Sequence, residues 1–256
     1  MSGFVAFLKK EIIESARSGK LIFLFILFVV FGIMNPAIAK LTPWLFEAMS
    51  EQLAESGMTV TSVNVDALTS WTQFFKNIPM ALIAFILMYG GIFTKEYESG
   101  SLVLILSKGL SRYKIVLAKS VLMLTFWTLG YWLCFVITYG YNAYYWDNGI
   151  AAELLPAVFN WWLFGLFTVA LTVLFSVLSK SGSGVLLETG GSIMALYLVG
   201  LYPKITHLIP TALMNSAKLL TGAESAGDYK EAVIITAVFS ILCIAVSIPI
   251  FNKKQV

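Results

Sequence analysis

Six long apolar stretches restrict the possible folds of this chain more than any other feature of its sequence. Each stretch has at least 17 residues, and a helix of about 20 apolar residues crosses the hydrocarbon core of a bilayer. Charged residues make up only 12% of the chain, roughly half of their share in an average soluble domain. We therefore predict an all-α, polytopic membrane protein with one transmembrane domain over residues 1–256, whose spans are 21–39, 78–94, 115–145, 155–178, 185–201 and 232–251.

Basic residues are distributed unevenly between the two sides of these predicted spans. Lys and Arg are enriched in the cytoplasmic loops of membrane proteins. If both termini lie in the cytoplasm, 12 of the 17 Lys and Arg residues fall on that side and 5 fall outside. Six spans with cytoplasmic N- and C-termini is the only simple topology that gives this asymmetry. The formal net charge of +3 is too small to indicate a nucleic-acid partner.

Residues 1–20 precede the first span and have a helical pattern. Phe4, Leu8 and Ile12 recur on one face, while charged side chains occupy the other. This pattern predicts an amphipathic helix that lies in the membrane interface. An ordinary charged tail is the alternative.

The segment after the first span begins with a proline signal. Asn35-Pro36 predicts a kink or an early exit from the membrane, because proline removes a backbone donor from the helix. The periodicity of Pro43–Gly57 then predicts a surface helix on the outer side.

Residues 95–114, between the second and third spans, form the densest charge cluster of the chain. Glu96 and Glu98 come first, followed by Gly100, the apolar block Leu102–Leu106 and a group of basic residues. One interpretation is a basic flank that separates two membrane helices. The apolar block favours a docking element for a cytoplasmic partner, because a loop in water does not normally expose such a block uncovered.

The order Glu-x-Glu-x-Gly-(Ser/Thr)-Leu, followed by Leu-Ser-Arg-x-Lys and a Lys at the start of the next span, resembles type-2 ATP-binding-cassette (ABC) transporter permeases. The matching positions are Glu96, Glu98, Gly100, Ser101, Leu102, Ser111, Arg112 and Lys119. Members of that family often have Pro where this chain has Gly109. The resemblance implies that residues 95–114 form a cytoplasmic coupling element that packs on an ATPase subunit.

The resemblance also implies partners and a location. A half-size permease would assemble with a second permease copy, as a homodimer or with a related chain, and with two separate ABC ATPase subunits in a bacterial plasma membrane. ATP and magnesium would be bound by the ATPase, so this chain itself would be no enzyme and would need no cofactor. The residues expected to carry the coupling are Glu96, Glu98, Gly100, Leu102, Leu104 and Arg112, on a short helix Glu96–Lys108 docked in a groove of the partner.

Several catalytic signatures are absent from the sequence. No Gly-x4-Gly-Lys-Ser/Thr loop occurs, so the chain cannot bind ATP through such a loop. His207 is the only histidine, which excludes His-Glu-x-x-His, and no Gly-x-Ser-x-Gly elbow is present. We therefore predict no catalytic, cofactor or metal site in this chain.

Glu188 is the one acidic residue inside a predicted span, and such residues are functional candidates. The alternative is that its side chain reaches the cytoplasmic headgroups or pairs with Lys180, because it lies about one turn from the loop at Gly184.

The sequence favours an ATP-driven exporter of a hydrophobic or amphipathic substrate, such as a peptide toxin or an antimicrobial peptide, because the outer loops are small. Export of ions or drugs by an ABC transporter is an alternative. A rival hypothesis is an ion-coupled secondary transporter, which would need several charges within the membrane. A third hypothesis is a membrane scaffold or immunity protein that transports nothing.

Overall fold

The computed structural model describes residues 3–49, 65–107 and 109–254, with the side chains of all of these except Leu104 and Ile105. These residues form helices and no strand, and six of the helices are long and apolar enough to cross a membrane. The six are α2 Lys20–Ala48, α4 Ala67–Tyr89, α7 Arg112–Tyr145, α8 Leu154–Leu178, α9 Gly182–Val199 and α10 Lys230–Lys253. The predicted all-α membrane fold is confirmed.

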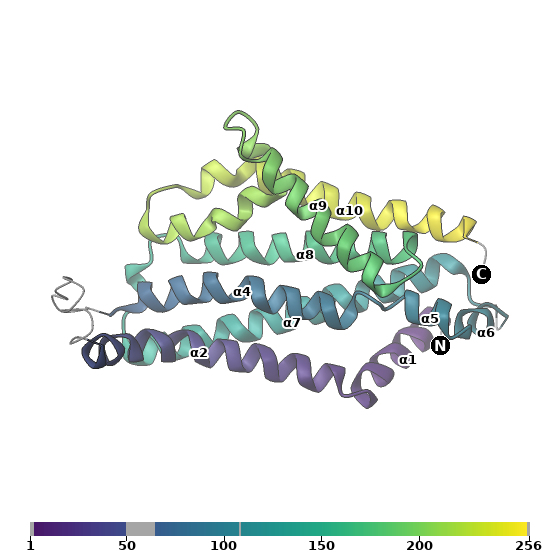
Figure 1. Cartoon of the computed structure of the whole chain (residues 1–256), viewed down its shortest axis with the longest axis horizontal. Coiled ribbons are helices and arrows are strands. Elements are labelled where there is room, and N and C mark those ends of the chain that lie inside the picture. Colours follow the sequence, from purple (N-terminus) through teal and green to yellow (C-terminus); the bar gives the residue numbers. More distant parts are fainter. Residues whose placement is uncertain (1–2, 50–64, 108, 255–256) are drawn as a thin grey trace.

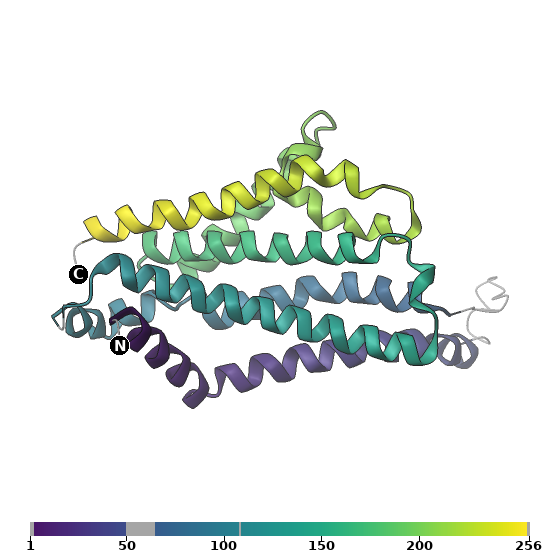
Figure 2. The same cartoon turned by 180° about the vertical axis from the view of Figure 1, so that it is seen from behind.

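The spanning helices form one elongated bundle, which α9 crosses obliquely (Figure 1). α8 is the most buried of them, whereas α9 and α10 cover one side and remain largely exposed. The two described ends of the chain lie at the same end of the bundle, as the view from behind also shows (Figure 2). We call this end the terminal face and the opposite end the far end.

Two glycines allow α7 to approach its neighbours closely. A Cβ atom at Gly165 of α8 would lie 2.1 Å from the indole of Trp127, and one at Gly130 of α7 would lie 2.4 Å from the ring of Phe28. Both aromatic side chains are fully buried and meet edge to face, with ring centroids 5.9 Å apart. Small residues at helix crossings permit this packing inside a membrane.

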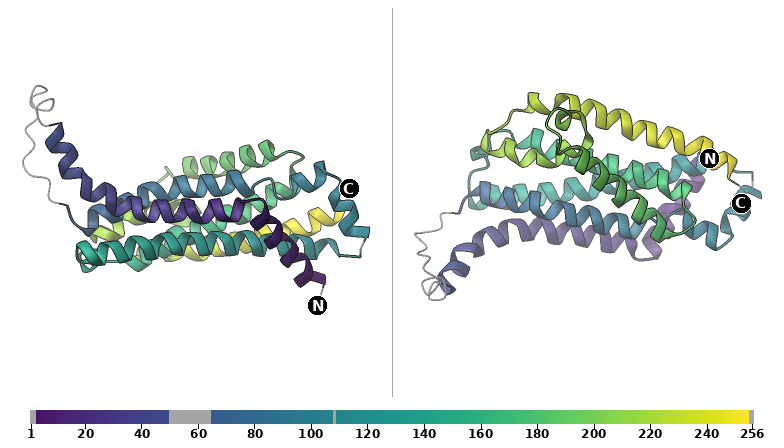
Figure 3. Two further views of the ribbon diagram at one scale, coloured as in Figure 1. Left: turned by 90° about the horizontal axis from the view of Figure 1, so that it is seen from below. Right: turned by 45° about the horizontal axis from the view of Figure 1, so that its top comes forward.

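The N-terminal helix α1 (Gly3–Arg17) leaves the axis of α2 at an elbow (Figure 3). Gly19 forms the elbow with a left-handed φ of 73°. The buried side of α1 is only partly the predicted one: Phe4 and Leu8 pack against the core as predicted, but Phe7 and Glu11 are the buried residues and Ile12 is 40% exposed. Glu11 is buried through a pairing with α7, and helical periodicity does not reveal a pairing between distant segments.

Asn35-Pro36 does not end the first span, because α2 continues through it for three more turns. The Asn35 side chain donates to the Thr138 hydroxyl at 3.0 Å and accepts from the Asn77 amide at 2.8 Å. These bonds hold α2 to α4 and α7 where Pro36 removes a backbone bond. The predicted surface helix Pro43–Gly57 therefore begins inside α2, and its part beyond residue 49 lies outside the described residues.

The second spanning helix begins at Ala67, well before its predicted start at residue 78. The Asp66 carboxylate caps it by accepting from the backbone N–H of Thr69 at 2.9 Å. Trp71 and Phe74 in its first turns are fully buried. Polar residues lie between and around them, so the mean hydropathy of this amphipathic start is too low to indicate a span.

The segment between α9 and α10 folds back along the far end of the bundle (Figure 1). It contains three 3-10 helices, η2 Thr206–Leu208, η3 Pro210–Thr221 and η4 Ala226–Tyr229. Leu213 and Leu219 of η3 are fully buried, and the indole of Trp161 in α8 donates to the Met214 carbonyl at 3.1 Å. This segment therefore packs on α8 and completes the core at the far end.

Candidate functional site

Two short helices, α5 (Thr94–Glu98) and α6 (Ser101–Ser107), connect α4 to α7 at the terminal face. They lie near both described chain ends (Figures 1 and 2). The predicted single helix Glu96–Lys108 is divided, because Gly100 has a left-handed φ of 65° that ends α5. Gly109, before α7, has a φ of 82°. Residues other than glycine are strained in this conformation.

A cluster of buried charges joins α1, α5 and α7 beside this connection. Lys119 of α7 is 1% exposed and forms ion pairs with Glu11 of α1 at 2.8 Å and with Glu96 of α5 at 3.1 Å. Its ammonium also donates to the Ile92 carbonyl at 3.2 Å. Lys10 of α1 reaches the same two carboxylates at 2.8 and 3.5 Å. We call Lys10, Glu11, Glu96 and Lys119 the ion cluster.

The ion cluster favours the charged forms of its α1 members. Burial opposes ionisation of Glu11, but the positive charge of Lys119 and hydrogen bonds from Lys10 and Lys119 hold the pKa of this carboxyl below its ordinary value. Burial also opposes the charge of Lys10, but hydrogen bonds to Glu11 and Glu14 raise the pKa of its ammonium above the ordinary value. The pairing of these two residues therefore persists at neutral pH.

Two predicted coupling residues point into the chain and not toward a partner, which corrects their expected orientation. Glu96 is 8% exposed and belongs to the ion cluster, while Leu102 is 1% exposed and belongs to the apolar core. Each anchors one short helix to the bundle. Lys95 and Glu98 of α5 and Val103 and Ser107 of α6 are exposed, Val103 at 52%. The Leu104 side chain lies outside the described part of the structure.

Arg112 is a further predicted coupling residue. It binds residues 251–254 of its own chain, which we call the C-terminal tail. Its guanidinium donates to the backbone carbonyls of Phe251 at 3.1 Å and Asn252 at 3.4 Å, and to that of Lys254. These carbonyls lie at the end of α10, where helical partners run out. The first residue of α7 is thus fastened to the last turn of α10.

Lys254 fastens the same tail to the end of α8. Its ammonium donates to the carbonyls of Val177 at 2.6 Å and Ser179 at 2.9 Å. The Ser179 hydroxyl in turn donates to the carboxylate of Glu188 in α9. Glu188, the predicted intramembrane polar site, is exposed, and within the described residues it forms no ion pair with Lys180.

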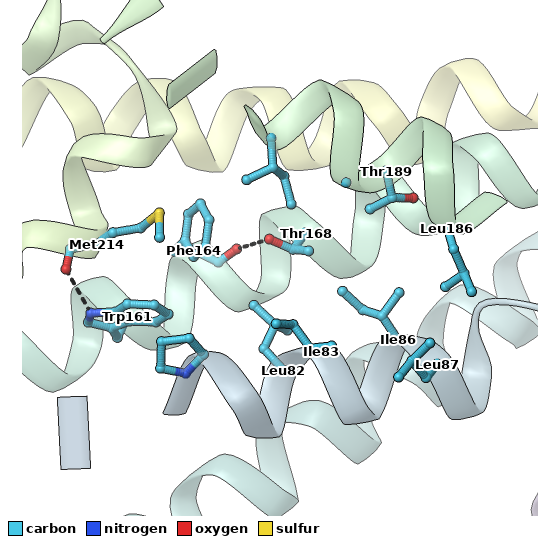
Figure 4. A pocket seen from close by; sticks show the side chains of 13 residues that line it. Leu82, Ile83, Ile86, Leu87, Trp161, Phe164, Thr168, Leu186, Thr189 and Met214 are labelled. Atoms are coloured by element: carbon cyan, nitrogen blue, oxygen red, sulfur yellow. Dashed lines mark hydrogen bonds between the residues drawn. The ribbon is translucent and has the colours of Figure 1, made fainter. Parts of the chain in front are cut away.

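An apolar crevice of about 330 Å³ lies between α4, α8, α9 and η3 (Figure 4). Its described lining includes no charged side chain, and its main contributors are Leu82, Ile86, Trp161, Phe164, Leu186 and Met214. Thr168 also lines it, and its hydroxyl donates to the Phe164 carbonyl at 3.0 Å. A crevice of this kind binds apolar groups. No sequence pattern indicated it, because four separate elements form it.

Side-chain contacts at the terminal face connect several helices. The ion cluster joins α5 to α1 and α7, and Arg112 joins the start of α7 to the end of α10. Among the described residues, no group of three or more His, Cys, Asp or Glu side chains could hold a metal ion. Sequence reasoning missed Glu11 and Lys254. Glu11 had a usable signal, because a carboxylate beside Phe7 and Leu8 on an apolar face needs a cationic partner.

Comparison with known protein families gives a match over nearly the whole chain. Residues 5–255 match the sequence model described as ABC-2 family transporter protein. The match includes all six spanning helices and the terminal face. No curated protein and no solved structure matches the chain.

Proposed function

Because the chain belongs to the ABC-2 family of transporter proteins, we propose that it is the permease subunit of an ATP-driven exporter in a bacterial plasma membrane. Two copies would assemble with two separate ATPase subunits, which would bind ATP and magnesium. The terminal face would lie in the cytoplasm, where the uneven distribution of Lys and Arg favours it.

The observation that carries this proposal is the attachment of α5 and α6 to the bundle. Glu96 and Leu102 hold the two short helices on α1, α7 and the core. A partner that moves α5 and α6 would therefore move the spanning helices with them. Interfaces and packed cores transmit such shifts because they have discrete arrangements.

The proposed contact surface for the ATPase is the outward side of α5 and α6. Val103 would supply apolar area, and the exposed Glu98 would face a basic group of the partner. Gly100 would set the angle between the two helices through its left-handed turn. Glu96, Leu102 and Arg112 would contribute to coupling from inside the chain.

The proposed cargo is hydrophobic or amphipathic, such as a peptide toxin or an antimicrobial peptide. The uncharged crevice beside α4, α8 and α9 supports this class, because a strongly polar cargo would lose its hydration there without gaining partners. The crevice would receive the apolar side of the cargo from the bilayer.

The test is purification of the tagged chain in mild detergent from cells that carry its own genomic neighbourhood, followed by reconstitution in vesicles. We expect an ATPase subunit with a phosphate-binding loop to co-purify, and ATP to drive uptake of a fluorescent amphipathic helical peptide into inside-out vesicles. Val103→Asp and Glu98→Lys should release the ATPase while leaving the chain folded, because both side chains are exposed.

Glu231→Lys is the matched control, because Glu231 is an exposed acid at the far end, 62% exposed at its side chain. This variant should keep the ATPase. If Val103→Asp and Glu98→Lys both retain the ATPase and full transport, the contact surface is not on α5 and α6. If the wild-type chain neither binds an ATPase nor transports with ATP, the proposed function is wrong.

A further inference from the structure

The C-terminal tail of the chain is held by two basic side chains that each bind the end of a helix. Arg112 binds carbonyls in the last turn of α10, and Lys254 binds carbonyls in the last turn of α8. The last four carbonyls of a helix lack intrahelical partners and carry partial negative charge, which favours a cation there. We call Arg112 and Lys254, the carbonyls that they bind, and the Phe251 side chain the tail clasp.

The tail clasp also has an aromatic part that reaches α5. Phe251 is fully buried, and its ring centroid lies 5.7 Å from that of Phe93 and 6.2 Å from that of Tyr97. The ammonium of Lys254 lies 4.2 Å from the centroid of the Tyr97 ring. A cation over an aromatic face at this distance is attracted to it. The tail therefore contacts α5 through both Phe251 and Lys254.

Arg112 connects the tail clasp to α6 and α7. Arg112 is the first residue of α7 and follows α6 after a short turn. A movement of α5 and α6 acts on Arg112 through the chain itself, and on the tail through Tyr97. Among the described residues, the hydrogen bonds of Arg112 and the ring contact of Tyr97 with α10 are all made with residues 251–254, which include the last turn of that helix.

We propose that the C-terminal tail is the link that transmits movement of α5 and α6 to α8 and α10, with Arg112 and Lys254 as positioning residues. This inference rests on the proposed function, because it concerns how ATPase-driven movement spreads through the permease. The ion cluster carries the same movement to α1 and α7. The two connections together reach the helices on both sides of α5.

The first experiment uses the isolated chain and does not depend on an ATPase. Spin labels are attached to cysteines at Asn252 and Lys180, two exposed positions on either side of the clasp, after replacement of Cys134 and Cys243 by serine. We expect a narrow distance distribution in this background. Arg112→Gln and Lys254→Gln should broaden it, because each removes the cation that binds a helix end.

Lys253→Gln is the matched control, because Lys253 is an exposed neighbour of Lys254 and no hydrogen bond or ion pair is recorded for it among the described residues. Its distance distribution should stay narrow. Lys254→Arg should also stay narrow, because it keeps a cation that can donate to carbonyls. Unchanged distributions in Arg112→Gln and Lys254→Gln would overturn the tail clasp.

The second experiment measures substrate transported per ATP hydrolysed in the complex with the ATPase. Lys254→Gln should keep the ATPase bound and basal hydrolysis unchanged, while transport per ATP falls about 5-fold or more, the lower end of typical coupling between sites. Arg112→Gln should lower transport per ATP by a similar factor. Lys254→Arg should restore it. If the distances broaden but transport per ATP is unchanged, the tail is a structural contact only and the proposal fails. If the wild-type complex shows no ATP-driven transport, the proposed function fails instead, and the distance measurement still stands.

Discussion

The two ends of the bundle hold their charged residues in opposite ways. At the terminal face, Lys119 is buried and pairs with Glu11 and Glu96, which come from helices far apart in the sequence. At the far end, Lys218 pairs with Glu224 only six positions away, at 2.6 Å, and both side chains are accessible, 56% and 31% exposed.

The difference lies in what each set of contacts connects. The Lys218–Glu224 pair stabilises a local turn, as does the capping box in which the Asp228 carboxylate accepts from the backbone N–H of Ser225 at 2.8 Å. Contacts at the far end that join distant segments, between His207 and Glu231 and from the Ala226 N–H to the Glu153 carboxylate, are exposed. The pairs at the terminal face join separate helices. The charged contacts that join separate helices are therefore buried at the terminal face and exposed at the far end.

The largest expected effect comes from removing the central cation of the ion cluster. Lys119→Met would leave the buried Glu11 and Glu96 with only the half-exposed Lys10 as a partner, and breaking a buried ion pair costs about 3–5 kcal/mol. Lys218→Met, the counterpart at the far end, should cost less than about 1 kcal/mol because its pair is exposed. The free energy of unfolding in mixed detergent micelles, followed by tryptophan fluorescence, measures both.

Additional substitutions test whether charge is the cause of that loss. Glu11→Gln together with Glu96→Gln should recover much of the stability lost in Lys119→Met, because the uncompensated charges disappear with them. Equal losses for Lys119→Met and Lys218→Met would contradict the contrast between the two ends.

A smaller effect is expected from two glycines that have the same backbone conformation at opposite ends. Gly100 and Gly222 have φ of 65° and 69°, and neither would bring a Cβ atom into a clash. Alanine at either position should cost about 1–2 kcal/mol, the usual penalty of the left-handed region. Only Gly100→Ala should also reduce transport, because it changes the angle between α5 and α6. Equal transport by the two variants would remove the functional distinction between the ends.

The contribution of Glu11 to the free energy of unfolding should be constant near neutral pH and should be lost on acidification. The pKa of Glu11 lies below its ordinary value in the folded chain, mainly through Lys119 against the opposing effect of burial. Its stabilising contribution is therefore complete above the unfolded pKa of about 4.3 and is lost as the pH falls through the folded value. The stability difference between wild type and Glu11→Gln should shrink below about pH 4. A difference that stays constant between neutral pH and pH 3 would show that Glu11 is not ionised in the fold.

The sequence predicted the spanning helices because hydropathy is a local property of each stretch. A motif singled out Gly100, and the structure has a left-handed turn at this residue. The sequence could not predict that Glu96 is buried, because its partner Lys119 lies 23 positions away on another helix. The contacts of Arg112 and Lys254 could not be predicted from the sequence either. Both side chains bind backbone carbonyls, which every residue has.

The smallest expected effect belongs to Glu188, the acidic residue of the predicted span in α9. Its carboxylate is exposed and accepts a hydrogen bond from the Ser179 hydroxyl, and a glutamine oxygen can accept the same bond. Glu188→Gln should therefore leave transport near the wild-type rate and change the free energy of unfolding by less than about 1 kcal/mol, the net value of a typical hydrogen bond. Ser179→Ala provides the comparison, because it removes the donor and leaves the charge. Transport rates of the two variants and the wild type are compared in vesicles with matched expression and assembly. Loss of transport in Glu188→Gln but not in Ser179→Ala would show that the negative charge itself serves transport, and the functional region would then extend from the terminal face into the membrane along α9.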